Sequence, residues 1–588
     1  MDRQVRGQPV SRSARRGIRR VLLLLPLVLA AVPLAVVPAL ALEFTSSNLP
    51  IILIDTPAGD IPDEPKVDAR MRVIDNGPGR RNRVDDEPSA YDGIVGIELR
   101  GSSSLNFPKK SFGLETREED GSNRNFPLLG LPEENDWVLH GPYSDKSLMR
   151  NVIAYWIANE LGRYASRARF CELVIDGHYM GLYVLLEKVK RDGERIDIAR
   201  LREDEVGGED VTGGYILRID RFAAGVDGGW FSWLQVDELR PFYRYEYPDA
   251  GVIRPAQEHY IQNFVNGLET ALLSPEFTDP EVGYRRYLDL DSLVDYVIVN
   301  EIAKNVDAYR LSMFMFKDRD RDGGAGKLEF GPVWDFNLGF GNVDYDVHPD
   351  APIRGAQTAG LLLNSRILWG SWQFWFWLRR IFQDPEFIAR LDRRWRQVRT
   401  DLLTEERIES RIEAAAELLA EAQERNFARW PVLGVDVWPN YFVGRSHREE
   451  VDYLKDWFRQ RLLWMDAELM AAAATVPDID LERVTIVAAA EPRRPDRFAL
   501  LPAFPNPFNG AATISYQLPE AGQVRLAVHS ILGQEVAILA QGWRGSGVHR
   551  LTWNGRDAAG RSVGSGPYLL ELRAPSGAVA GGRLTVVR

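Results

Sequence analysis

Two aspartates lie in settings that suit the binding of a metal ion and of nucleotide phosphates. Asp335 directly follows a predicted strand, and Asn337 and several glycines come just after it, so the backbone can approach a ligand there. A carboxylate in such a place suits Mg²⁺, which prefers oxygen ligands and often shares its coordination shell with phosphates. Asp307 comes 28 positions earlier, between a predicted helix and a predicted strand. The strand, turn and strand between them could bring the two acids to one end of a hairpin.

A basic stretch upstream offers a partner for phosphate charge. Arg100 opens a Gly-Ser turn that contains Ser102 and Ser103, and Lys109 and Lys110 follow it at the start of a predicted strand. A lysine there could neutralise phosphate charge, while the turn could donate backbone amides to the phosphate oxygens. A solvated surface explains most single Asp or Lys side chains, so the argument depends on the combination.

A further acidic pattern matches a calcium-binding loop. Asp318, Asp320, Asp322 and Gly323, with Glu329 at the twelfth position, fit the spacing D-x-D-x-D-G followed by a glutamate. The flanking residues predict strands, whereas calcium loops of this kind join two helices. A polar hairpin turn is therefore the simpler interpretation, and Ca²⁺ binding on a non-helical scaffold is the alternative.

Several kinds of chemistry are disfavoured by the composition. The seven histidines form no H-E-x-x-H pair and there is no Walker-type phosphate loop, which argues against a metalloprotease and a P-loop enzyme. The single cysteine, Cys171, excludes an internal disulfide and a cysteine-based zinc cluster. Its neighbours predict a strand, so we expect a buried side chain and not a catalytic thiol. The net charge of −12 disfavours nucleic acid as a partner.

The elements that must position these residues can be predicted from apolar spacing and turn formers. We expect a mixture of helices and strands as far as residue 470. The predicted strands cover 48–56, 93–115 around the Gly-Ser turn, 171–188 as a hairpin turning at Asp176-Gly177, 213–220, 313–316 and 328–333. The predicted helices cover 145–161, 288–304 and most of 365–470, including one helix over 404–426.

The N-terminus has the pattern of a signal peptide over residues 1–41. Arginines precede an apolar run that ends in Ala-Leu-Ala, a cleavage-site pattern. Three prolines within the run argue against a permanent membrane helix, although an uncleaved anchor and a twin-arginine export route stay open. No second apolar run of spanning length follows, so we expect no permanent membrane span and a secreted or cell-surface location.

The C-terminal part changes character. Residues 476–500 combine prolines with charged residues, which predicts a linker. From 501 to 588 only short β-like segments occur, separated by Gly-rich turns, as in an antiparallel sandwich.

Six landmarks in order over about 240 residues give the central region, 43–475, a resemblance to the CotH kinase family. They are RGSSS at 100–104 with PKKSF at 108–112, YSDKSLMRN at 143–151, GHYMGLY at 177–183 with EK at 187–188, GGY at 213–215, NVD at 305–307 and WDFN at 334–337. The resemblance implies an α+β, atypical and reduced protein-kinase-like fold. It also implies ATP and Mg²⁺ as cofactors and a protein as the substrate.

The family resemblance also implies roles for individual residues. Asp335 would take the metal-binding role of the aspartate in the Asp-Phe-Gly element of ordinary kinases. Asp307 would be the catalytic base or a second metal contact. Lys109 or Lys110 would hold ATP phosphates, with Glu187 or another acid orienting the lysine.

One departure from the family pattern concerns the second metal contact. Family members carry an asparagine shortly after the catalytic aspartate, whereas here Asp307 is followed by Ala-Tyr-Arg-Leu-Ser. Asn305 or Asn337 could supply that ligand. A pseudokinase that only binds nucleotide is the alternative.

The tail resembles the C-terminal sorting domains of type IX secretion and the related FlgD-type Ig-like domains. The motifs are FPNPFN at 504–509, LGQEV at 532–536, WNGRD at 553–557, GPY at 566–568 and RLTVVR at 583–588. This resemblance implies the export machinery as a partner and leaves open cleavage or retention of the tail. The leading hypothesis is an exported kinase that phosphorylates a protein, and the alternative is a surface structural, adhesive or glycan-binding protein on the same scaffold.

Overall fold

The structure is a computed structural model, and it describes most of the chain from Phe44 onward. The described residues are 44–57, 60–222, 228–236, 240–321, 324–344, 355–364, 376–487, 498–501, 503, 506, 508, 512–520, 522–544, 547–558, 560–574 and 577–587. The predicted signal peptide, 1–41, lies outside them. Among these residues, no helix is long and apolar enough to cross a membrane.

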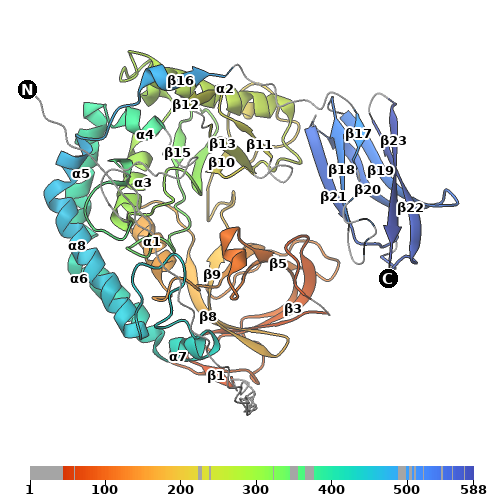
Figure 1. Cartoon of the computed structure of the whole chain (residues 1–588), viewed down its shortest axis with the longest axis horizontal. Coiled ribbons are helices and arrows are strands. Elements are labelled where there is room, and N and C mark those ends of the chain that lie inside the picture. Colours follow the sequence, from red (N-terminus) through yellow and green to blue (C-terminus); the bar gives the residue numbers. More distant parts are fainter. Residues whose placement is uncertain are drawn as a thin grey trace, which may run out of the picture. The chain divides into compact units, whose positions relative to one another are not determined.

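Seven strands near the N-terminus close into a barrel (Figure 1). In barrel order they are β2 (Ile51–Asp55), β3 (Val67–Ile74), β5 (Tyr91–Arg100), β6 (Ser111–Arg117), β7 (Asp136–His140), β9 (His178–Glu187) and β8 (Ala168–Ile175). All neighbours are antiparallel except β2 and β8, whose parallel pairing completes the closure. Alternate residues fill the interior, as expected where one face of each strand is buried. They include Ile97, Leu114, Leu139, Cys171, Leu173 and Leu185.

The hairpin between β8 and β9 confirms the prediction for residues 171–188. Asp176 and Gly177 both have positive φ, 50° and 75°, which is the backbone of a two-residue hairpin turn. Cys171 is fully buried in the barrel, and burial raises the pKa of its thiol. The prediction of a buried cysteine is therefore confirmed.

A second, five-stranded antiparallel sheet follows the barrel. Its strand order is β11 (Gly229–Phe231), β13 (Phe242–Tyr247), β10 (Tyr215–Asp220), β14 (Met313–Lys317) and β15 (Leu328–Phe330). Helix α3 (Leu290–Ala303) packs against β15, α1 (Arg150–Glu160) and α5 (Pro385–Asp401). One large apolar core joins these elements with α2 (Pro255–Leu273) and α4 (Phe376–Ile381). The barrel and the second sheet are thereby parts of one packed body.

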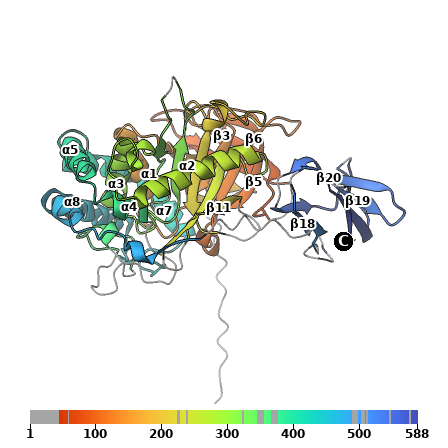
Figure 2. The ribbon, with the colours of Figure 1, turned by 90° about the horizontal axis from the view of Figure 1, so that it is seen from above.

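Three of the later helices, α5, α6 (Glu405–Leu418) and α8 (His447–Ala473), lie on the side of this body opposite to β3 and β5 (Figures 1 and 2). Helix α7 (Ala420–Arg429) lies instead against the barrel. The single helix predicted over 404–426 is wrong, because the chain changes direction at Leu419, where α6 ends and α7 begins. The turn lets α7 pack on β9, where the Asn426 amide oxygen accepts from the Leu182 backbone at 3.3 Å.

The predicted linker also needs a correction. Within 476–500, β16 (Val484–Ile486) pairs antiparallel with β12 (Leu234–Val236), far away in the sequence. Backbone pairing thus makes residues 484–486 part of the helix-and-strand body. Residues 488–497 lie outside the described part of the chain.

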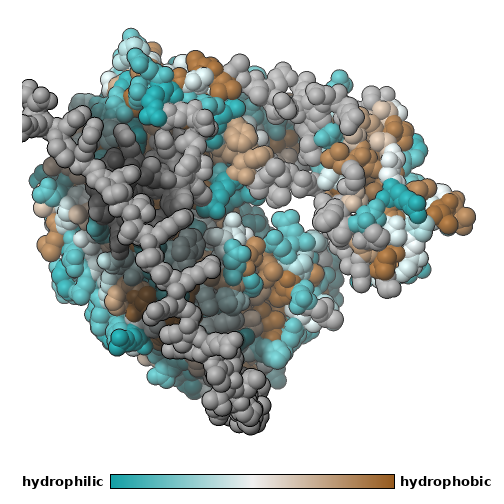
Figure 3. Space-filling view, in the orientation of Figure 1, coloured by the Kyte–Doolittle hydropathy of each residue, from teal (hydrophilic) through white to brown (hydrophobic). Residues whose placement is uncertain are grey.

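In the described residues of the C-terminal domain, all the regular elements are strands. One sheet has the order β17 (Ala499–Leu500), β18 (Ala512–Leu518) and β21 (Gly547–Trp553), and the other has β20 (Glu535–Arg544), β19 (Gly522–Ser530), β22 (Gly566–Arg573) and β23 (Val579–Val586). Both sheets contribute to one apolar core that includes Ile514, Leu526, Trp553 and Leu584. Hydrophilic and hydrophobic residues are interspersed over its outer surface (Figure 3). The expected α+β body followed by an all-β sandwich is confirmed.

Candidate functional site

A cavity of about 560 Å³ lies among the barrel, α1 and the loops that follow α3 and β15. This volume is within the range of small-molecule sites. Six of the ten residues predicted for the site line it: Arg100, Ser102, Ser103, Asp307, Asp335 and Asn337. The structure thus brings together residues from positions 100 to 337 of the sequence.

The backbone around Asp335 is held by side chains of α1. Asp335 has a φ of 65°, a left-handed conformation that is uncommon for a residue with a side chain. Its N–H donates to the Tyr155 hydroxyl at 3.3 Å, and the next N–H, of Phe336, donates to the Asn151 amide oxygen at 2.6 Å. These bonds fix the direction in which the Asp335 carboxylate leaves the backbone.

Asn305 ties the two acidic loops together. Its side-chain Nδ2 donates to the Asp335 carbonyl at 3.1 Å, and its Oδ1 accepts from the Asp307 N–H at 3.3 Å. Asn305 is buried and is not among the residues that line the cavity. Asn305 therefore has a positioning role instead of the expected role as a metal ligand. Of the two asparagines that were expected to bind the metal, Asn337 is the one that lines the cavity.

The two carboxylates are in an environment that disfavours their negative charge. Burial, together with the nearby Asp307 and Asp220, raises the pKa of Asp335 to about 7, against the opposing effect of Arg100. Burial also raises the pKa of Asp307, which Arg310 opposes. A cation between the acids would relieve this repulsion.

The residues around Asp335 fit a magnesium ion. Among the residues that the structure describes, none donates a hydrogen bond to the Asp335 carboxylate, and Asn337 lines the same cavity. Mg²⁺ is typically held by one or two carboxylates together with substrate phosphates, and this group matches that composition. Asp335 would hold the ion, which would neutralise phosphate charge.

Arginines supply the positive charge of the cavity wall. Arg100, at the end of β5, lies over the ring of Trp334 at 5.8 Å, and burial lowers the pKa of its guanidinium. Arg221 and Arg310 also line the cavity. Arg310 forms an ion pair with Asp307. The sequence reasoning did not single out these last two arginines, although Arg310 lies only three positions after Asp307.

Neither predicted lysine reaches the cavity. The Lys109 ammonium is buried and donates to the carbonyls of Leu182 at 2.6 Å and Pro142 at 3.2 Å and to the Asn426 amide at 2.7 Å. Burial lowers the Lys109 pKa to about 7. Lys110 donates to the Leu105 carbonyl at 2.5 Å and so supports the turn beside the cavity. The expectation that one of them holds phosphates is corrected, because neither lysine lines the cavity and both ammonium groups donate to protein oxygens.

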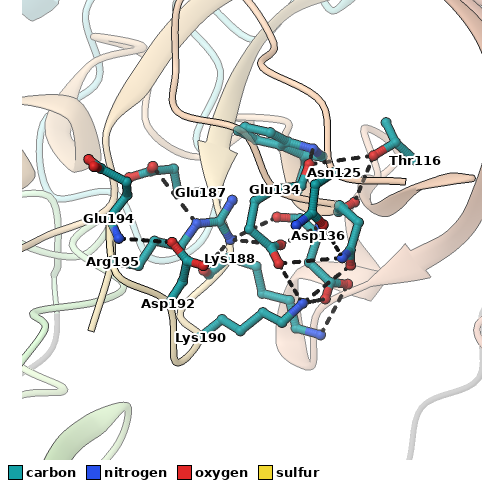
Figure 4. Close-up of polar contacts among 12 residues, drawn as sticks. Thr116, Asn125, Glu134, Asp136, Glu187, Lys188, Lys190, Asp192, Glu194 and Arg195 are labelled. Carbon is teal, nitrogen blue, oxygen red and sulfur yellow. Dashed lines mark hydrogen bonds and ion pairs between the residues drawn. The ribbon is translucent and has the colours of Figure 1, made fainter. Parts of the chain in front are cut away.

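Glu187 is engaged in a separate ion-pair network (Figure 4). The guanidinium of Arg167 binds its carboxylate at 2.9 and 2.7 Å, and Arg195 lies 3.8 Å from it. In the same network Lys190 pairs with Glu134 at 2.7 Å. Glu187 therefore stabilises the end of β9 and does not orient a lysine at the cavity.

Three further residues that line the cavity, His140, Asn151 and Tyr155, were not singled out for the site from the sequence. His140 Nε2 lies 3.3 Å from the Asn151 amide nitrogen, and burial lowers the His140 pKa to about 4, so the ring is neutral at pH 7. Tyr155 and Asn151 hold the Asp335 loop as described above. Asn151 is the last residue of the YSDKSLMRN landmark, so the sequence marked the segment as part of the family pattern. It did not indicate that Asn151 accepts from the Phe336 N–H.

Two acids of the calcium-like pattern, Asp318 and Asp320, are bonded to protein groups. Asp318 accepts from the Ala199 N–H at 2.7 Å, and Asp320 accepts from the ammonium of Lys317 at 2.8 Å. Asp322 and Gly323 lie outside the described residues. Among the described residues, no three His, Cys, Asp or Glu side chains gather as a metal cluster.

Comparison with known proteins identifies both parts of the chain. The family described as CotH kinase protein matches residues 97–465, and the FlgD Ig-like domain matches residues 505–578. No curated protein matches.

Two solved structures show weak similarity. FlgD from P. aeruginosa is 23% identical over 13% of this chain and 64% of its own, with a TM-score of 0.12. The alkylpurine DNA glycosylase AlkC of Pseudomonas fluorescens, bound to DNA with an abasic site analogue, is 14% identical over 38% of this chain and 56% of its own, with a TM-score of 0.13. The chain thus spans less than two thirds of either, and neither score supports an argument about fold. The family match, in contrast, covers more than half of the sequence, and the chain belongs to the CotH kinase protein family.

Proposed function

We propose that this protein is an exported atypical kinase that transfers the γ-phosphoryl group of ATP to a serine or threonine hydroxyl of a protein. The observation that carries the proposal is that Asp307, Asp335 and Arg100 line one cavity of small-molecule size. Phosphoryl transfer asks a protein mainly for positioning and charge neutralisation, which two acids, a metal and a guanidinium can supply.

Each residue has a part in the proposed transfer. The Asp307 carboxylate accepts the proton of the substrate hydroxyl, whose oxygen forms a new bond to the γ-phosphorus. The bond between the γ-phosphorus and the β–γ bridging oxygen breaks, and ADP leaves with that electron pair. Arg100 and the backbone of the turn at 101–104 hold phosphate oxygens, and Asp335 and Asn337 hold Mg²⁺. The raised pKa of Asp307 favours proton acceptance.

The export part of the proposal depends on the two ends of the chain. The basic and apolar pattern of residues 1–41 supports entry into an export pathway. The FlgD Ig-like domain at 505–578 supports a role at or beyond the cell surface, with type IX sorting as the finer proposal. The substrate would then be a surface or exported protein.

The test is Mg²⁺-dependent ATP binding and autophosphorylation by the purified chain. Asp335→Asn and Asp307→Asn are compared with wild type, and Asp456→Asn, an exposed acid of α8, is the matched control. We expect Asp335→Asn to melt as wild type does and Asp307→Asn, which loses the charge that pairs with Arg310, to stay folded with a lower melting temperature. Both should lose transfer at least about 100-fold, and the control should keep it. Wild type that ignores Mg-ATP would instead mark the fold as a binding scaffold for adhesion or structure.

A further inference from the structure

We propose that this site uses one divalent cation, held at Asp335, and that the Arg310 guanidinium occupies the place of a second cation beside Asp307. The inference rests on the proposed kinase function. Ordinary protein kinases hold two Mg²⁺ ions, one on the aspartate of Asp-Phe-Gly and one on an asparagine of the catalytic loop. In this chain the corresponding loop presents a fixed positive charge instead.

The Arg310–Asp307 contact is built into the fold. A guanidinium nitrogen of Arg310 binds the Asp307 carboxylate, and Arg310 Nε donates to the Val306 carbonyl at 3.0 Å. The side chains are only 9% and 17% exposed, respectively. A partly buried pair that is anchored at a second point keeps its geometry better than an exposed pair, which is easily exchanged for water and salt.

A second guanidinium strengthens the positive charge beside Asp307. Arg221 lies at the end of β10 and lines the same cavity, and its charge lowers the pKa of Asp307 together with that of Arg310. The opposing groups are Asp220 and Asp335. A second divalent cation at Asp307 would have to displace one guanidinium and stay close to the other, which is electrostatically unfavourable.

The loop also has no spare amide for a second cation. Asn305, which precedes Asp307 by two residues, uses both ends of its side chain already: Nδ2 donates to the Asp335 carbonyl of the other acidic loop, and Oδ1 accepts from the Asp307 N–H. Asp335, by contrast, receives no hydrogen bond at its carboxylate from any residue that the structure describes. The two acids thus have different roles. Asp307 is already paired with the Arg310 guanidinium and acts as the catalytic base, whereas the Asp335 carboxylate can bind a metal ion.

The inference is tested by counting bound Mn²⁺ with electron paramagnetic resonance. The full chain is saturated with adenylyl imidodiphosphate, a non-hydrolysable ATP analogue, and nucleotide binding is measured separately by displacement of a fluorescent nucleotide. We expect one Mn²⁺ per nucleotide-bound chain. We expect Asp335→Asn to weaken Mn²⁺ binding at least about tenfold, as loss of a carboxylate ligand should.

Variants of Arg310 separate its charge from its bulk. Arg310→Ala exposes Asp307 and should raise the count to two, whereas Arg310→Lys keeps a positive charge and should leave the count at one. If Arg310→Ala does not fold, the wild-type count alone still decides. Two Mn²⁺ per wild-type chain would overturn the inference and leave the kinase proposal standing, whereas absence of nucleotide binding would overturn both.

Discussion

Replacing Arg100 and Lys109 separately by methionine distinguishes the cation that meets the nucleotide from the one that supports the fold. Methionine keeps much of the length of either side chain and removes the charge. Arg100 lines the cavity and lies over Trp334. Lys109 points instead to carbonyl and amide oxygens of the packed body. The two variants should therefore fail in different ways.

The expected magnitudes follow from these contacts. A hydrogen bond from a charged donor contributes about 1.5–3 kcal/mol, so Arg100→Met should weaken ATP binding about 10- to 150-fold. Lys109→Met removes a donor from three oxygens, of which the Asn426 amide oxygen keeps the Leu182 N–H, and each oxygen left unpaired costs about 1–3 kcal/mol. Part of this loss is offset, because burial already disfavours the charged ammonium and lowers its pKa to about 7. We expect its free energy of unfolding to fall by about 2–4 kcal/mol, with little change in ATP affinity.

The assay combines calorimetric titration of Mg-ATP with thermal and urea unfolding of the same preparations. Arg100→Lys is the matched control, because it keeps the charge but loses the planar fork of the guanidinium, and it should give an intermediate affinity. The reasoning is refuted if Lys109→Met unfolds cooperatively yet no longer binds ATP, while Arg100→Met binds it as wild type does.

Three further predictions follow from the site. Because the metal needs the ionised carboxylate and the pKa of Asp335 is raised to about 7, Mn²⁺ affinity should fall about tenfold per pH unit below pH 7 and level off above it; titrations at pH 5.5, 6.5 and 8 would show a flat profile if this is wrong. Asn305→Ala removes the bond to the Asp335 carbonyl and the bond from the Asp307 N–H, so single-turnover transfer should slow about 10- to 100-fold in a protein that still binds ATP; an unchanged rate would show that Asn305 does not position the acids. Glu187→Gln leaves Arg167 and Arg195 without their buried negative charge and should lower the free energy of unfolding in urea by about 3–5 kcal/mol. A loss of ATP affinity in the folded variant would instead show that Glu187 contributes to the nucleotide site.

Local patterns were enough to predict much of the fold. The hairpin at Asp176-Gly177 is determined by residues that accept positive φ, and the burial of Cys171 was expected from the predicted strand and from the usual burial of free cysteine. The break at Leu419 and the strand Val484–Ile486 depend on partners far away in the sequence, β9 and β12. The spacing of apolar residues within 404–426 or 476–500 does not indicate these distant partners.

The same distinction applies to the site. Asp307, Asp335 and Arg100 were found because their motifs resemble those of a family, and they line one cavity. The direction of Lys109 could not be predicted, because its acceptors at Leu182 and Asn426 come from β9 and α7. The Arg310–Asp307 pair is local, at a spacing of three residues, and its signal was present in the sequence.

The account's central claim is that this cavity is a nucleotide site, and a crystal structure of the chain with adenylyl imidodiphosphate and Mn²⁺ tests it most directly. The account predicts an anomalous Mn²⁺ peak at Asp335, phosphate oxygens against Arg100, and the Arg310–Asp307 pair intact. Nucleotide bound elsewhere on the chain, or the cavity filled by side chains with no nucleotide at saturating concentration, would contradict it.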